Sequence, residues 1–125
     1  MQTPFGDLRV CDAHVHFFSH AFFSTLGGQK GLSLQAIQAF VGWQLPGAEP
    51  VELAERWSTE LDTHGVSRCV LIASMPGDDG SVAAAVRAFP GKFIGYFMCD
   101  PTAAGAADQA GRAFDAGLKG MCLFP

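Results

Sequence analysis

The 125-residue sequence predicts an α/β fold in which successive β/α units build a parallel sheet. Residues 67–74, 92–99 and 119–124 are nearly continuous apolar runs that lack polar alternation. Such runs are typical of strands that are covered on both faces, as they are in parallel sheets. The three runs start about 25 residues apart, which is the length of one β/α unit. We therefore expect a repeated strand–helix pattern over most of the chain.

Composition and charge limit the classes of protein to which the chain can belong. The chain is 49% hydrophobic and 16% charged, which is the composition of one folded domain over residues 1–125. The net charge is −4 and the 8 Lys and Arg residues are scattered, which argues against a nucleic acid or an anionic membrane as partner. The sequence shows neither a signal peptide nor an apolar run of about 18 residues that could span a membrane. We expect a cytoplasmic protein whose partner is a small molecule or another copy of the chain.

The four cysteines are predicted to be free thiols. Cys11, Cys69, Cys99 and Cys122 lie far apart and form no C-x-x-C pair. This spacing is typical of neither a zinc knuckle nor a disulfide framework. Each cysteine lies in a predicted strand, where a free Cys behaves as a small hydrophobic residue.

The first half of the chain is expected to contain one strand and two helices. The strand covers residues 8–17, and the following stretch 18–31, rich in Phe, Gly and Ser, is expected to be a long loop. A short helix is predicted over residues 34–43, with Ser33 as its N-cap. A longer helix begins at Pro50, which suits a first helical position, and ends before a glycine.

Two further helices alternate with the later strands. Asp78 or Asp79 can cap a helix over residues 81–89, and an alanine-rich helix over residues 103–116 ends at Gly117. The resulting order, β-α-α-β-α-β-α-β, is compatible with an open doubly wound sheet or with part of a barrel. Periodicity alone leaves these two architectures open.

The first strand carries the residues with metal-binding chemistry. Residues 10–16, VCDAHVH, alternate strictly, so that Asp12, His14 and His16 are expected on one face of the strand, toward its carboxyl end. Three adjacent buried polar groups are costly unless each finds a partner. Imidazoles at positions i and i+2 can both reach one divalent ion at about 2.0–2.1 Å. We predict that His14 and His16 bind a metal and that Asp12 supports the site, in preference to a pair of histidines that are merely hydrogen-bonded to neighbours.

The segment 9–18, RVCDAHVHFF, resembles the D-x-H-x-H motif that opens the amidohydrolase superfamily. It is most similar to the branch that includes aminocarboxymuconate-semialdehyde decarboxylase, related aromatic-acid decarboxylases and dicarboxylate lactonases. Residues 65–71, 93–101 and 117–125 resemble the second, third and fourth strands of that branch. TatD-type nucleases and polymerase-histidinol-phosphatase domains open with a similar motif. Residues 117–125 favour the decarboxylase and lactonase branch, because they carry G-x-K-G followed by an apolar run and a proline.

The resemblance implies the N-terminal half of a TIM (β/α)₈ barrel, with barrel strands one to four in residues 1–125. It implies a divalent metal, with zinc as the expected ion, in a hydrolase or non-oxidative decarboxylase acting on a small cyclic or aromatic carboxylic acid. In that family the other metal histidines and the catalytic aspartate come from strands five, six and eight, so no catalytic residue can be assigned here. Phe124 stands where members often carry a polar residue or histidine.

Two alternatives to an enzyme remain open at this point. A half-barrel could be a catalytically inactive fragment or a self-associating α/β module, because four of eight strands cannot close a barrel. A flavodoxin-like binder would show no metal and a small ligand bound at a switch point of the sheet. The half-barrel interpretation predicts self-association or completion of the barrel by its missing half.

Overall fold

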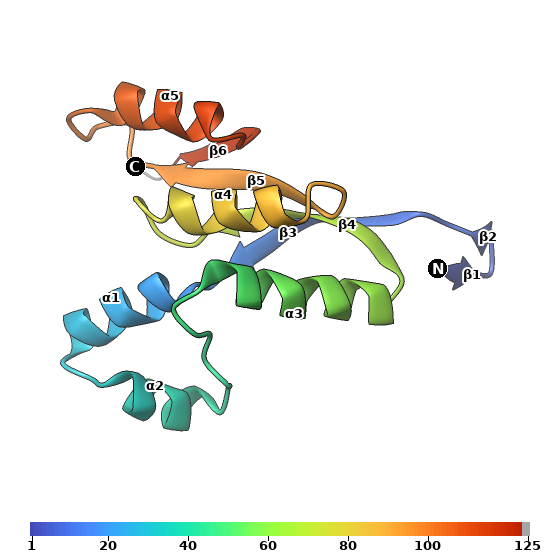
Figure 1. Ribbon diagram of the computed structural model, residues 1–125, viewed down its shortest axis with the longest axis horizontal. Coiled ribbons are helices and arrows are strands. Elements are labelled where there is room, and N and C mark those ends of the chain that lie inside the picture. Colours follow the sequence, from blue (N-terminus) through green and yellow to red (C-terminus); the bar gives the residue numbers. More distant parts are fainter. Residues whose placement is uncertain (124–125) are drawn as a thin grey trace.

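The computed structural model describes residues 1–123, which form an α/β domain around a four-stranded parallel sheet (Figure 1). In chain order the elements are β1 (Gln2–Thr3), β2 (Gly6–Asp7), β3 (Val10–Phe17), α1 (His20–Lys30), α2 (Leu34–Val41), α3 (Pro50–Thr63), β4 (Val66–Ala73), α4 (Asp79–Ala88), β5 (Phe93–Cys99), α5 (Ala106–Asp115) and β6 (Gly120–Leu123). The four predicted strands are β3 to β6, each within two residues of its expected bounds. Phe124, the last residue predicted for the fourth strand, lies outside the described residues.

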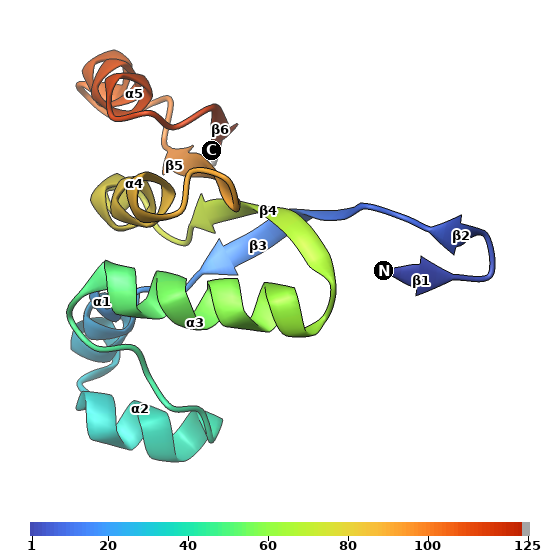
Figure 2. The same ribbon diagram turned by 45° about the vertical axis from the view of Figure 1, so that its right-hand side comes forward.

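The sheet has the sequential order β3-β4-β5-β6, and all three neighbouring pairs are parallel. A helix follows each of the first three strands, and α3, α4 and α5 lie on the same side of the sheet (Figure 2). The predicted α/β fold of parallel β/α units is thus confirmed. The described residues show neither the reversal of strand order nor the helices on both faces that a complete doubly wound sheet has.

The main core lies between the sheet and these three helices. Phe17, Leu71 and Phe97, from three adjacent strands, are fully buried in one cluster with residues of α3, α4 and α5. At Gly95 an added Cβ would lie 2.4 Å from Leu118 Cδ2, so only glycine allows this close approach to β5. The sheet is therefore tightly packed on its helix-covered face.

The opposite face of the sheet forms a separate and smaller apolar cluster. Val70, Ile72 and Met98 are buried there, and Tyr96 and Cys122 are partly buried against them. No residue of a helix belongs to this cluster among the described residues. The sheet therefore has one face covered by helices and a second, open face that carries no helix among the described residues and on which these apolar side chains bury one another.

The helices of the sheet layer form where the sequence predicts them, with shifted ends. Pro50 opens α3, and the C-terminal turn is closed by Gly65 at φ +66°. Asp78 is the residue before α4, although its carboxylate caps no backbone N–H. In α5 the first turn begins three residues later than expected, after Gly105.

Residues 18–31 contain a helix, and the expectation of a long loop there is wrong. Ser19 caps α1 by accepting a hydrogen bond from Phe22 N at 3.1 Å, and Gly31 ends it in the left-handed conformation. Gly27 sits where α1 meets the start of α2, since an added Cβ would be 2.7 Å from Leu32 O and 3.1 Å from Ile37 Cδ1. Gly27, one of the glycines that suggested a loop, therefore serves helix–helix contact. The predicted helix 34–43 is confirmed, with Ser33 as its cap, and ends at Val41.

The N-terminal residues form a small antiparallel hairpin, β1 with β2, which the sequence analysis did not predict. None of the helices in residues 1–123 has the length and apolarity that a membrane-crossing segment needs.

Candidate metal centre

The strand β3 is not regular, and its irregularity decides which way its polar residues lie. Asp12 is paired with Cys69 and Val15 with Leu71, so three steps along β3 match two steps along β4. This extra residue is a β-bulge, and it interrupts the strict alternation expected from the sequence. By register, Asp12 belongs with Cys69 on the helix-covered side, whereas His16 pairs with Ile72 of the open face.

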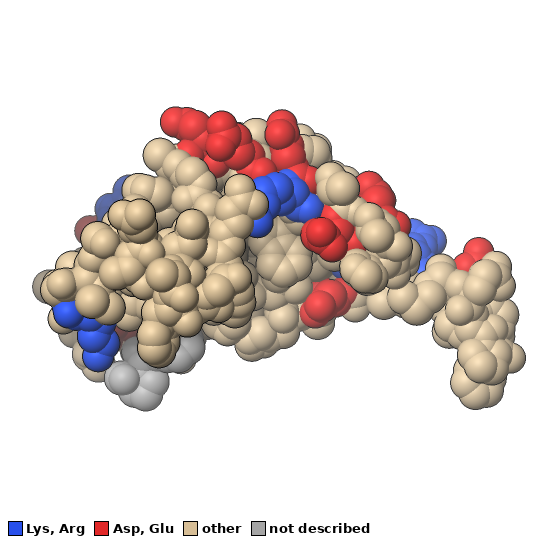
Figure 3. Space-filling model, turned by 90° about the horizontal axis from the view of Figure 1, so that it is seen from below, with Lys and Arg blue, Asp and Glu red and all other residues tan. Residues whose placement is uncertain are grey.

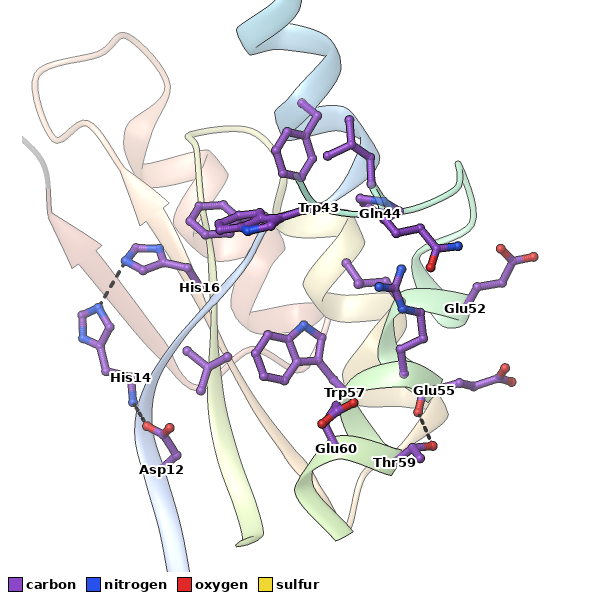
Figure 4. Close-up of a pocket in the computed structure, with 17 residues that line it drawn as sticks. Asp12, His14, His16, Trp43, Gln44, Glu52, Glu55, Trp57, Thr59 and Glu60 are labelled. Carbon is purple, nitrogen blue, oxygen red and sulfur yellow. Dashed lines mark hydrogen bonds between the residues drawn. The ribbon is translucent and has the colours of Figure 1, made fainter. Parts of the chain in front are cut away.

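The two predicted ligands, His14 and His16, lie side by side at the carboxyl half of β3. Their Nε2 atoms are 3.3 Å apart and their ring centroids 5.1 Å apart, in an edge-on arrangement. Figure 4 shows the two rings turned toward one another on the same side of the strand. The convergence expected from the i, i+2 spacing is present.

This geometry fits a metal ion bound by both imidazoles. Two nitrogens that bind one tetrahedral zinc ion at about 2.0–2.1 Å are about 3.3–3.4 Å apart. The Nε2–Nε2 distance of 3.3 Å lies at this value. His14 is exposed and His16 half-buried, so that an ion can reach the pair from solvent.

Ser74, which immediately follows β4, contacts the second histidine and was missed by the sequence analysis. Its Oγ lies 3.4 Å from His16 Nδ1 and 3.5 Å from the carbonyl oxygen of Ile72. The hydroxyl can donate to the carbonyl or to Nδ1, so the contact is compatible with either tautomer of His16. With the proton on Nδ1, the hydroxyl accepts from it and the Nε2 lone pair of His16 is free for a metal.

Asp12 supports the centre through the backbone. Its Oδ1 accepts a hydrogen bond from the backbone N–H of His14 at 3.0 Å, inside the bulge. The carboxylate therefore fixes the conformation of the chain at His14. In the described structure it does not orient an imidazole directly.

The described residues bring together two imidazole nitrogens and no larger set of metal-binding groups. No group of three or more His, Cys, Asp and Glu residues within 1–123 is arranged to hold a metal ion. Catalytic zinc sites usually have three protein ligands and a bound water. A complete site would therefore need ligands from outside the described part of one copy.

Aromatic side chains lie next to the imidazole pair. The ring of His16 stacks on Phe18 with 5.5 Å between centroids and an interplanar angle of 8°. Phe18 in turn contacts Phe22 at 4.7 Å and Trp43 at 6.4 Å between centroids. These tilted rings form an apolar aromatic wall beside His16.

A buried carboxylate fixes the chain just after β3. Asp78 accepts hydrogen bonds from the hydroxyls of Ser19 and Ser81, each at 2.5 Å, and both Asp78 and Ser19 are buried. The bond joins the start of α1 to the start of α4, which follow two adjacent strands. It therefore holds the segment that carries Phe18.

A cleft of about 1010 Å³ lies beside β3, bordered by α3 and the segment between α2 and α3. Both histidines border it, but Figure 4 shows their imidazole rings on the opposite side of β3 from Trp57 and α3. Figure 3 shows acidic side chains beside a hollow on this face of the molecule. The cleft and the imidazole pair thus lie on two sides of one strand.

Two titratable groups with shifted pKa values lie outside the imidazole pair. Burial, followed by the charges of Asp12 and Cys11, raises the pKa of the Cys69 thiol to about 12. Hydrogen bonds from Thr102 lower the pKa of the Asp100 carboxyl, which holds the turn after β5. A neutral buried thiol is a poor ligand and nucleophile, so Cys69 is a core residue.

Comparison of the chain with protein-family models, with curated proteins and with solved structures finds no match. The resemblance of residues 9–18 to the amidohydrolase motif stays a prediction. The candidate metal centre is therefore supported by the geometry of His14, His16 and their neighbours alone.

Proposed function

We propose that this chain carries the N-terminal half of a TIM (β/α)₈ barrel whose activity is that of a metal-dependent hydrolase or non-oxidative decarboxylase. The sequential parallel order and the one-sided helices support the barrel, because both are properties of one of its halves. The polar residues of β3 lie toward its carboxyl end, where barrel enzymes place their active sites.

The observation that carries the proposal is the 3.3 Å separation of the His14 and His16 Nε2 atoms. The same separation is compatible with a hydrogen bond between neutral imidazoles. A proton on Nδ1 of His16, accepted by Ser74, would leave Nε2 of His16 unprotonated for either a metal or a hydrogen bond from His14, and zinc affinity distinguishes the two.

When bound, a divalent ion such as zinc lowers the pKa of a water molecule toward about 7 and polarises a carbonyl or carboxylate. His14 and His16 would hold it through Nε2, with Ser74 fixing the orientation of His16 and Asp12 fixing the backbone at His14. The aromatic rings beside His16 suit a flat, apolar substrate ring. We therefore propose a small cyclic or aromatic carboxylic acid as the substrate.

One copy of the chain should show little catalytic activity. Two protein ligands leave the coordination of zinc incomplete, and the described residues offer no third. The proposal therefore assigns metal binding to this chain and catalysis to a complete barrel.

Zinc affinity tests the proposal directly. His14→Ala should lower the zinc affinity of the chain more than tenfold, because it removes one of two ligands. Affinity would be measured by competition with a chromophoric chelator, and retained metal by elemental analysis. His64→Ala is the matched control, because His64 lies at the C-terminal end of α3 away from the pair and its imidazole pairs with Glu60. Equal zinc binding by the His14 variant and the wild type would rule out the assignment.

A further inference from the structure

Asp78 is a buried carboxylate that lies outside the proposed chemistry. It is 5% exposed and accepts hydrogen bonds from the hydroxyls of Ser19 and Ser81, each at 2.5 Å. Ser19 is buried as well, at 2% exposure. Hydrogen bonds from hydroxyls to a carboxylate are shorter and stronger than those between neutral groups. Because a buried carboxylate needs such partners in place of water, we expect Asp78 and its two hydroxyls to stay together.

The bond between Ser19 and Asp78 joins two short loops at the carboxyl ends of adjacent strands. One loop leads from β3 into α1, and the other leads from β4 into α4. Each loop begins with a neighbour of the His16 imidazole. Phe18 stacks on the ring with 5.5 Å between centroids, and Ser74 Oγ lies 3.4 Å from Nδ1. The bond therefore links the two segments that contact this imidazole.

Phe18 lies between two fixed residues. Phe17 is fully buried in the main core, and the backbone N–H of Ser19 donates to its carbonyl oxygen at 2.9 Å. Asp78 then holds the side chain of Ser19. Because the backbone is fixed on both sides, the partly buried ring of Phe18 is limited to few rotamers and keeps its place on His16.

We propose that Asp78 is a positioning residue for the imidazole pair, acting through Ser19 to keep Phe18 and Ser74 against His16. Residues that orient a metal ligand without touching the metal strengthen binding, because they limit the orientations of that ligand. The benefit to zinc rests on the proposed function, whereas the orientation of the His16 ring rests on the contacts and hydrogen bonds alone.

The orientation of His16 can be tested in the full chain without metal. Ring protons of His16 and Phe18 should give cross-peaks in nuclear Overhauser spectra, because the two rings are stacked. Asp78→Ala should lose these cross-peaks while the circular dichroism spectrum stays unchanged. Wild-type cross-peaks in the Asp78 variant would overturn the proposal.

Ser81→Ala is the matched control for the Asp78 variant. It removes the other hydrogen bond to the same carboxylate and leaves the bond from Ser19 in place. The cross-peaks between His16 and Phe18 should therefore persist. Their loss in the Ser81 variant would contradict the route through Ser19.

Ser19→Ala tests the same bond if the Asp78 variant does not fold. Ser19 also caps α1, so the matched control is Ser33→Ala, which removes an equivalent cap from α2. Each serine accepts a hydrogen bond at 3.1 Å from a backbone N–H three residues later, and Ser19 in addition donates to Asp78. Loss of the cross-peaks in the Ser19 variant alone would support the proposal. Loss in both variants would overturn it, because weaker helices would then explain the result.

Zinc affinity, measured by chelator competition, separates this proposal from the proposed function. Asp78→Ala should weaken zinc binding about tenfold, as expected when a group that orients a ligand is removed. Ser81→Ala should bind zinc like the wild type. Unchanged affinity in the Asp78 variant would overturn the role of Asp78 in metal binding. A wild-type chain that binds no zinc but shows the expected cross-peaks would overturn the proposed function only.

Discussion

The α1–α2 arm (residues 20–41) and the sheet with its covering helices use their apolar residues in different ways. In the arm, burial is confined to Phe23, Gly27 and Ile37. Another large apolar residue of the arm, Phe40, is 89% exposed. Around the sheet, by contrast, three strands and three helices contribute to one continuous core in which Phe97 is fully buried.

This difference places stability and adaptability in separate parts of the molecule. Local opening costs little where few apolar contacts are buried, and helices of 8–11 residues such as α1 and α2 are marginal alone. The imidazole pair is carried by the well-packed sheet, whereas the arm supplies part of the aromatic wall beside it. We expect the ligands to be fixed and their surroundings to move.

The largest effect is expected in the sheet core. Phe97→Ala should lower the free energy of unfolding by about 3–5 kcal/mol, because it removes a buried ring that packs edge-on against Phe114. Phe40→Ala, a control in the arm, should change it by less than about 0.5 kcal/mol. Denaturant unfolding at one fixed protein concentration measures both. Similar costs for the two variants would remove the distinction between the regions.

An intermediate and local effect is expected inside the arm. Ile37→Ala removes the buried residue that joins α2 to Gly27 of α1, at a local cost of about 2–4 kcal/mol. Hydrogen exchange should become faster in residues 20–41 and stay unchanged in β4 and β5. An equal loss of protection in the sheet would show that the arm and the sheet open together.

The smallest of the three effects concerns what orients His16. Ser74→Ala should weaken zinc binding about tenfold, because it frees the Nδ1 side of the imidazole. Ser24→Ala is the matched control, since Ser24 lies in the arm and contacts His20 instead. Chelator competition measures both affinities. If the two serine variants bind zinc equally well, the sheet does not orient the ligand.

Most of the fold could be predicted because its signals are local. The apolar runs of β4 and β5 determine buried strands, and proline and glycine determine where α3 begins and ends. Helix α1 was missed because its apolar residues show no clear helical face and two adjacent glycines interrupt it. The signals that could have found it are Ser19 before the helix and Gly31 after it, with Lys30 in its last turn.

The candidate metal centre could be predicted only in part. The pairing of His14 with His16 follows from their spacing alone, because both extend from one strand. The position of Asp12 does not follow from its spacing to the histidines, because the bulge appears only when β3 is aligned with β4. Ser74 is 58 residues from His16 in the chain, and no periodic pattern connects them.

The hydrogen bond between Ser19 and Asp78 has a consequence for motion. It fixes the residue before α1 to the start of α4 and so anchors that end of the arm. When the arm opens, we expect it to pivot about residue 19 as a hinged flap on the microsecond to millisecond timescale. The residues before the pivot, Phe18 and His16 among them, would stay in place. In the proposed enzyme, substrate would enter past the moving helices while the two imidazoles keep their positions.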